Sequence, residues 1–277
     1  MTAEPIWKGA PLDAATALAL LDWQREMGAD EPILDDPVDR YAEIAPAPAP
    51  ASPQPALPGM PAAPAAAAAP APEIDLPAQA TAMAARAGSL SELAALMQDF
   101  DGLEIRRGAR NFVFADGNPG ARVMILGEAP GEEEDRQGRP FVGRAGQLLD
   151  QMFAAIGLSR QAVDAERALY ITNVLPWRPP GNRRPEQAEI DAMLPFVARH
   201  VELAAPDVLV LMGNTPCQAV LGRQGILRLR GQWTQGFGRP VLPMTPPAYV
   251  LRNPIAKRDS WADLLSLQAR LQAGSQP

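Results

Sequence analysis

The chain has 277 residues and a formal net charge of −7, but that charge is unevenly distributed. Residues 1–85 hold 3 Lys and Arg against 12 Asp and Glu, whereas residues 86–277 hold 22 against 20 and are close to neutral. The single cysteine excludes an internal disulfide and any metal or cluster site built from cysteines alone. Neither a signal peptide nor an apolar run long enough to span a membrane is recognisable, so we expect a cytoplasmic protein.

The N-terminal part differs in composition from the rest. Residues 11–27 combine a capping Asp13 with an apolar stripe, which predicts an amphipathic helix. Such a helix could recruit a protein partner or pack back on the core, and the sequence leaves both open. Residues 45–77 are dominated by Ala and Pro, which predicts an extended spacer. We therefore divide the chain into an N-terminal helix with an acidic segment (1–44), a disordered linker (45–85) and one folded domain (86–277).

Strand-like and helix-like patterns alternate through the folded domain. Strands are expected at residues 123–126, 168–175, 207–213 and 240–244, helices at 89–100, 146–156, 185–204, 215–221 and 259–271, and a loop at 246–254. This alternation predicts an α/β fold with a mainly parallel sheet covered by helices on both faces. Ligands of such sheets bind beyond the carboxyl ends of the strands, so we expect the functional loops after strands one, two and four.

The loop after the first strand has an unusual composition. It reads GEAPGEEED over residues 127–135 and continues as GRPFVG over residues 138–143. It lacks the glycine pattern of dinucleotide-binding loops and the Gly-Lys-Ser/Thr of nucleotide-triphosphate loops, and its carboxylates would repel a polyphosphate. Acidic side chains with one aromatic ring suit a small neutral or cation-like substrate better.

Four side chains in the first two loops are candidates for chemistry on a ring. Glu128 and Glu134 could orient a water or stabilise an oxocarbenium ion next to a ring–sugar bond. Phe141 could stack on a planar ring, and Asn173 offers a donor and an acceptor to the edge of a pyrimidine or another amide. Structural explanations also exist, since the run from Glu132 to Asp135 could be a solvated helix start, Phe141 could be core, and Asn173 could fix a turn.

Arginines follow the second and fourth strands. Arg178, Arg183 and Arg184 lie in a rigid loop rich in Pro and Gly, and Arg252 lies close to Tyr249 in the last loop. The arginine fork matches DNA phosphates, although an arginine-rich proteome would explain the composition equally well.

Taken together, these motifs resemble the family 4 uracil-DNA glycosylases. The resemblance rests on GEAPGEEED, GRPFVG, ITNV (171–174), RPPGNR (178–183) and PAYVLR (247–252), which occur in the family order. It covers about residues 98–272. It implies a three-layer α/β/α fold with a central four-stranded parallel sheet, and excision of uracil from DNA after the nucleotide is flipped out of the duplex.

The resemblance also implies roles for individual residues. The Ala129 backbone would contact the uracil, Glu128 would organise the catalytic loop, and Glu134 would position the water or the ring. Phe141 would stack on the flipped base. Asn173 would hydrogen-bond the uracil edge and reject cytosine, whose donor and acceptor are exchanged. In the last loop, residues 246–252 would insert beside the lesion.

The first departure from the family pattern is a missing histidine. The family normally has His directly before the Pro-x-Tyr/Ser-Leu-Leu-Arg run, and here that position is Pro246. The only histidine, His200, lies in the long helix after the second strand. Loss of one donor to the leaving base typically costs ~10²–10³ in rate, so we expect impaired activity unless Thr245 or Arg252 substitutes.

The second departure concerns the [4Fe–4S] cluster that family members usually bind through four cysteines. The two later ligand positions correspond to Trp177 and Met193, and the earlier pair falls near Phe100 and Leu103. Cys217 alone cannot hold a cluster. We therefore expect neither a metal nor a cofactor, with Trp177 and Met193 packing into the vacated space.

Two functional hypotheses follow. The first is a DNA repair glycosylase, acting in base excision repair as a monomer, that removes uracil or another deaminated base. The alternative is a non-catalytic DNA-binding or lesion-binding module on the same fold, recruited to a repair or replication partner through helix 11–27. The base-pocket residues favour the first hypothesis, and Pro246 favours the second. A nucleotide-binding metabolic enzyme is disfavoured by the acidic first loop.

Overall fold

The computed structural model describes residues 6–7, 10–11 and 75–274. The chain divides into two units, Met1–Ala68 and Ala69–Pro277. In the first unit the described residues form one short antiparallel pair, β1 (Ile6–Trp7) with β2 (Ala10–Pro11). Apart from Pro11, which belongs to β2, the predicted helix over 11–27 lies outside the described residues. The acidic run and the linker up to residue 74 lie outside them as well.

The second unit is built on a six-stranded sheet with the order β3-β5-β4-β6-β8-β7. The four central strands are parallel, and the two edge strands pair antiparallel with their neighbours. The expected four-stranded parallel sheet is therefore the centre of a larger mixed sheet. The strands are β3 (Ala115–Gly117), β4 (Val123–Gly127), β5 (Leu169–Asn173), β6 (Val208–Met212), β7 (Thr234–Gly236) and β8 (Arg239–Met244).

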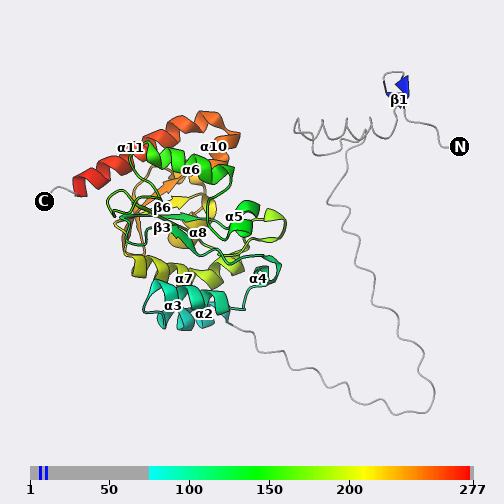
Figure 1. Cartoon of the computed structure of the whole chain (residues 1–277), viewed down its shortest axis with the longest axis vertical. Coiled ribbons are helices and arrows are strands. Elements are labelled where there is room, and N and C mark those ends of the chain that lie inside the picture. The colour runs from blue at the N-terminus through cyan, green and yellow to red at the C-terminus, as the bar shows by residue number, and fades with distance from the viewer. Residues whose placement is uncertain (1–5, 8–9, 12–74, 275–277) are drawn as a thin grey trace, which may run out of the picture. The chain divides into compact units, whose positions relative to one another are not determined.

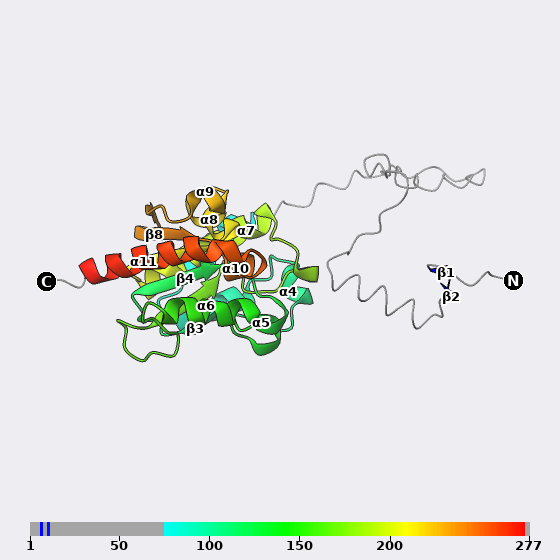
Figure 2. The same ribbon diagram turned by 90° about the horizontal axis from the view of Figure 1, so that it is seen from above.

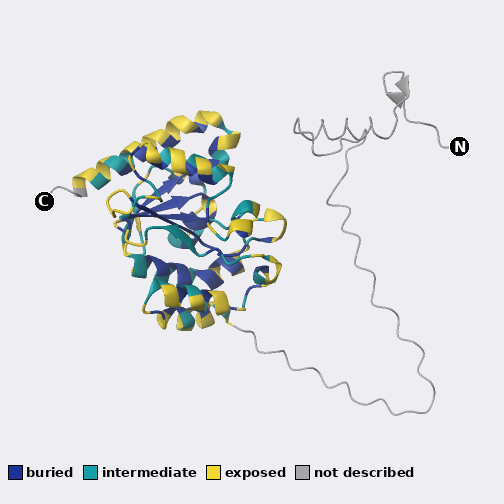
Figure 3. Ribbon diagram, in the orientation of Figure 1, coloured by how far each residue is buried: buried dark blue, intermediate teal, exposed yellow. Residues whose placement is uncertain are grey.

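The apolar runs identified in the sequence form the centre of the sheet. Every residue of β4, β5 and β6 is buried, as the dark strands in Figure 3 show. A parallel strand that is buried on both faces needs helices above and below it, which accounts for continuous rather than alternating hydrophobicity. The core is accordingly split into two hydrophobic clusters, one on each face of the sheet.

Helices cover both faces of the sheet (Figure 1). One face carries α2 (Leu76–Ala85), α3 (Leu90–Asp99), α7 (Gln187–Ala204) and α8 (Asn214–Leu221). The other carries α6 (Arg144–Ala154), α10 (Pro247–Arg252) and α11 (Lys257–Gly274), the layer nearest the viewer in Figure 2. Short helices complete the unit: α4 (Ile105–Gly108), α5 (Glu132–Gln137), η1 (Pro180–Asn182), α9 (Ile226–Leu229) and η2 (Pro254–Ala256). No helix of the described residues is long and apolar enough to cross a membrane.

Two expectations about helices were wrong. Residues 76–85, assigned to the linker, form α2, which begins at the capping carboxylate of Asp75 and packs its buried Ala80 and Ala84 toward α7. The folded part therefore begins near residue 75 and not at residue 86. The stretch expected as a loop over 246–254 contains α10, with Pro247 in the first helical position, where a missing backbone N–H costs nothing.

Candidate active site

A cavity of about 810 Å³ opens at the carboxyl ends of the four parallel strands. All four strand ends contribute to its lining, whereas we had expected only the loops after the first, second and fourth strands. The third, β6, contributes its last residue, Met212, and is followed by Gly213 and Thr215 at the start of α8, which also line the cavity. Of the candidate site residues, the lining includes Glu128, Ala129, Glu134, Phe141, Asn173, Arg184, Tyr249 and Arg252.

Phe141 and Asn173, which both line this cavity, meet next to Gly127. A Cβ atom on Gly127 would lie 2.3 Å from Asn173 Oδ1 and 2.5 Å from Phe141 Cε2, so only glycine fits there. Asn173 is 4% exposed, and its Oδ1 has no hydrogen-bond partner within the part of the chain that the structure describes. Because buried polar atoms are nearly always paired, an unpaired amide oxygen beside an aromatic ring is suited to a polar planar ligand.

Glu128 connects the loop after β4 to the start of α8. Its Oε2 accepts a hydrogen bond of 2.5 Å from Thr215 Oγ1. Thr215 is buried and was missed in the sequence, because it lies 87 residues away from Glu128 and only the fold brings the two together. The available signal was its place just after an apolar strand, in the run LMGNT. The bond fixes one carboxylate oxygen of Glu128 at the cavity wall.

Glu134, in α5, holds the segment that carries Phe141. Its Oε1 accepts hydrogen bonds of 2.9 Å from the backbone N–H groups of Val142 and Gly143, where α6 begins. Its Oε2 would lie 2.8 Å from a Cβ atom on Gly131, another cavity-lining position. One oxygen of Glu134 therefore fixes the backbone while the residue also borders the cavity.

The arginines of the predicted DNA-binding set differ in their surroundings. Arg184 and Arg252 are exposed at the cavity. Arg183 instead donates to both carboxylate oxygens of Glu189, at 2.7 and 2.9 Å, and these hydrogen bonds raise the pKa of its guanidinium. The guanidinium of Arg183 is thus already paired with Glu189, and this pairing shapes the loop between η1 and α7.

Arg178 borders a second, smaller cavity. It donates to Asn182 Oδ1 at 2.7 Å and lies 3.5 Å from a carboxylate oxygen of Glu132. This cavity of about 420 Å³ is also lined by Arg110 and Arg136. Arg178 is not among the residues that line the cavity that contains Asn173, although its partner Asn182 is.

Pro246 packs against the loop after β6. A Cβ atom on Gly213 would lie 3.4 Å from Pro246 Cγ, and both residues line the cavity. Of the two proposed substitutes for histidine, Arg252 lines the cavity, whereas Thr245 is buried with its hydroxyl 3.0 Å from Ser260 Oγ. His200 is buried on the α7 side of the sheet with Nε2 2.8 Å from the Tyr170 hydroxyl, and it is not among the cavity-lining residues.

The four positions where the resemblance places cluster ligands do not fit an iron–sulfur cluster. Phe100, Leu103, Trp177 and Met193 are all buried in the same hydrophobic cluster, and none of them offers a thiolate. Aromatic packing fills this region, with Phe100 5.4 Å from Phe196 and Trp177 5.6 Å from Phe112 between ring centroids. Burial raises the pKa of the Cys217 thiol to about 12, which keeps it protonated. Within residues 75–274 no cluster of His, Cys, Asp and Glu could hold a metal ion.

Comparisons with known proteins agree with the motifs. The family model described as the Uracil DNA glycosylase superfamily matches residues 114–265. A type-4 uracil-DNA glycosylase of Thermotoga maritima is 40% identical over 146 residues, covering 52% of this chain and 73% of the relative. Proteins of the same name from Sulfurisphaera tokodaii (40% identical; 52% and 67% covered) and Pyrobaculum aerophilum (34%; 63% and 91%) also match.

Proposed function

Because this chain belongs to the type-4 branch of the uracil-DNA glycosylase superfamily, we propose that it hydrolyses the N-glycosidic bond of uracil, or of a related deaminated base, in DNA. The observation that carries this proposal is the buried Oδ1 of Asn173, which has no hydrogen-bond partner in the described part of the chain and lies next to the Phe141 ring. The cavity around them is large enough for a base flipped out of the duplex.

Base recognition is assigned to Asn173, Phe141 and the Ala129 backbone. Uracil presents an N3–H donor beside its O4 acceptor, and the Asn173 amide offers the complementary acceptor and donor. Cytosine presents an acceptor at N3 and a donor at its exocyclic amine, so a fixed amide would face two mismatched groups. A mismatch of buried polar groups is a strong basis for discrimination.

The bond-breaking step is assigned to the two glutamates. The N1–C1′ bond breaks with both electrons leaving on the base, and a water then adds to C1′ and loses a proton. A carboxylate near C1′ can stabilise the positive charge on the sugar or orient that water. Glu128 and Glu134 each have one oxygen held by the protein, at Thr215 Oγ1 and at the amides of residues 142 and 143. Each keeps its second oxygen for the substrate.

The DNA itself would be held by Arg184, Arg252 and Tyr249 at the cavity and by Arg178 beside the smaller cavity. Arginine forks suit phosphate oxygens. Arg183 would contribute indirectly, since its fork holds Glu189. The partner in this proposal is uracil-containing DNA bound by a monomer, and neither a metal nor a cofactor takes part.

A second candidate function is a DNA-binding or lesion-binding module without catalysis. Pro246 favours it, because proline cannot donate a hydrogen bond to a leaving base at the position where the family has histidine. In this alternative, the segment 11–27, predicted from its sequence to be an amphipathic helix, would recruit a repair or replication partner.

Single-turnover excision from a labelled oligonucleotide with one uracil separates the two functions. We expect the parent to produce an alkali-labile site on the uracil strand and none on a matched thymine strand. Asn173→Ala and Glu134→Ala should each lower the rate, by ~10² or more if the contact acts in the transition state. A parent that binds the uracil strand without ever cleaving it would support the non-catalytic module instead.

A further inference from the structure

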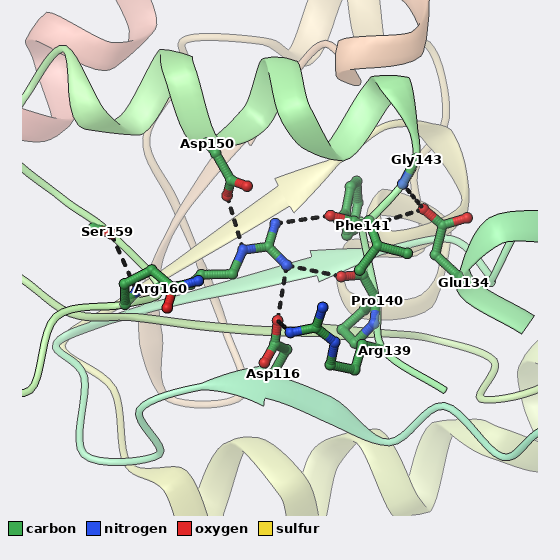
Figure 4. A network of polar contacts seen from close by, with 11 residues as sticks. Asp116, Glu134, Arg139, Pro140, Phe141, Gly143, Asp150, Ser159 and Arg160 are labelled. Atoms are coloured by element: carbon green, nitrogen blue, oxygen red, sulfur yellow. Dashed lines mark hydrogen bonds and ion pairs between the residues drawn. The ribbon is translucent and has the colours of Figure 1, made fainter. Parts of the chain in front are cut away.

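Arg160 is an enclosed arginine that contacts the backbone of the base-stacking segment. Its side chain is only 6% exposed. It donates to the carbonyl oxygens of Pro140 and Phe141, each at 2.9 Å. Its charge is balanced by Asp116 of β3 at 3.0 Å and Asp150 of α6 at 2.8 Å. Figure 4 shows the guanidinium at the centre of these four contacts.

The backbone that Arg160 holds is in an unfavourable conformation. Phe141 has φ of 53°, in the left-handed region that bulky residues rarely adopt. A Cβ atom on Gly146 would lie 1.8 Å from the Phe141 carbonyl oxygen, so α6 can approach this carbonyl only because residue 146 is glycine. Conformations of this kind persist where surrounding contacts impose them, and they concentrate at functional sites.

The same segment is held from its other side by Glu134. That carboxylate accepts from the N–H groups of residues 142 and 143, whereas Arg160 donates to the carbonyls of residues 140 and 141. Four consecutive residues are thus fixed by two charged side chains of opposite sign. Between these two anchors the Phe141 ring reaches the Gly127 position beside Asn173.

We propose that Arg160 is a positioning residue for the base pocket: it imposes the left-handed backbone at Phe141 and so sets the ring where a flipped base stacks. The identity of the stacked base rests on the proposed function, but the effect on the ring does not. Arginine suits this task because its planar fork can reach two carbonyls and two carboxylates at once. The point charge of lysine cannot.

Arg122 provides a matched control at the opposite end of the sheet. It also joins distant segments through carboxylates, Glu166 and Asp207, each at 2.6 Å, and its side chain is 16% exposed. It precedes the first residue of β4, whereas the cavity lies beyond the last. Both Arg160→Lys and Arg122→Lys remove an arginine that joins distant segments. The first does so beside the cavity, and the second does so away from it.

The first measurement is made without any ligand. With 4-fluorophenylalanine placed at position 141, the ¹⁹F resonance should shift or broaden in Arg160→Lys and stay unchanged in Arg122→Lys. The second measurement is binding to oligonucleotides that contain either a cleavage-resistant 2′-fluorodeoxyuridine or an abasic site. Arg160→Lys should weaken binding to the uracil strand about tenfold and leave binding to the abasic strand unchanged, because an abasic site has no ring to stack.

A double variant shows whether Arg160 acts through the ring. Phe141→Ala combined with Arg160→Lys should bind the uracil strand no more weakly than Phe141→Ala alone. An unchanged ¹⁹F resonance in Arg160→Lys, or fully additive losses, would overturn the positioning role. A parent that fails to distinguish the uracil strand from the abasic strand would instead count against the proposed function, and the ¹⁹F comparison would still decide the role of Arg160.

Discussion

Gly127 and Asn173 are register partners at the carboxyl ends of β4 and β5, and Asn173 Oδ1 lies 2.3 Å from where a Cβ on Gly127 would be. Gly127→Ala should therefore displace both the amide and the Phe141 ring. Since a displacement near 1 Å can cost ~10² in rate, we expect uracil excision to fall by about that factor. Single-turnover rates on the uracil oligonucleotide measure it.

Gly108→Ala is the matched control for that substitution. Gly108 lies in α4, and the nearest heavy atom to an added Cβ would be Pro180 Cγ at 4.0 Å. The excision rate of Gly108→Ala should equal that of the parent. Equal rates in Gly127→Ala and the parent would show that the wall formed by Asn173 and Phe141 does not contact the substrate.

The neighbours Thr172 and Asn173 should separate stability from activity. Thr172 Oγ1 donates to the Phe114 carbonyl at 2.6 Å, whereas Asn173 Oδ1 is buried without a partner in the described part of the chain. Thr172→Val should lower the free energy of unfolding by about 1 kcal/mol and spare excision. Asn173→Ala should abolish most excision while unfolding stays within about 1 kcal/mol of the parent, because no hydrogen bond is lost. Urea denaturation combined with excision rates tests the pair. A large loss of stability in Asn173→Ala would show that Asn173 has a structural role.

The parallel strands could be predicted from sequence because continuous apolar runs leave little alternative to a strand covered on both faces. The edge strands could not. β3 and β7 have three residues each, Ala-Asp-Gly and Thr-Gln-Gly, and neither shows hydrophobic alternation. Helix α2 could not be predicted for a different reason. Its alanines continue the Ala-rich composition of the spacer, and only their packing against α7 distinguishes the helix from the spacer.

The site was predictable to the extent that its residues lie in contiguous motifs. Asn173 and Phe141 were identified from their motifs and line one cavity. Thr215 and Arg160 were not, because their importance arises from contacts with Glu128 and Phe141 that the folded chain alone creates. Arg183 illustrates the reverse case, in which a residue typical of phosphate binding is occupied by an internal carboxylate.

The apolar residues at the positions expected for iron–sulfur ligands should stabilise the fold. Trp177 is buried with its ring 5.6 Å from that of Phe112, so Trp177→Ala should lower the free energy of unfolding by about 3–5 kcal/mol. Trp261→Ala is the control, since Trp261 is 44% exposed and its loss should cost no more than about 0.5 kcal/mol. Urea denaturation measures both, and elemental analysis of the purified protein should find no stoichiometric iron. Iron that is bound to the parent and lost from Trp177→Ala would contradict the expected absence of an iron–sulfur cluster.

His200 should make the fold sensitive to acid. Burial lowers its pKa to about 3, so the folded protein keeps a neutral ring below the unfolded value near 6.5. The unfolded state therefore binds one more proton between these values, and stability falls as pH decreases through that window, by about 1.4 kcal/mol per pH unit from this group. His200→Gln should remove that component while leaving the carboxylates to titrate as before. Unfolding free energies of both proteins from pH 7 to pH 4 test it, and parallel curves would refute it.

Pro246 occupies the position where an imidazole would complete the family pattern, and it packs against Gly213 at the cavity. It is the N-cap of α10 with φ of −66° and ψ of 145°, an extended conformation that histidine adopts without strain. Pro246→His should therefore raise the excision rate, by up to ~10² if the new ring donates to the departing base. Pro246→Ala is the control, since it removes the same ring without adding a donor and should leave the rate unchanged. A gain in both variants would mean that proline obstructs the substrate, and a gain in neither would mean that another group has taken over the donor's role.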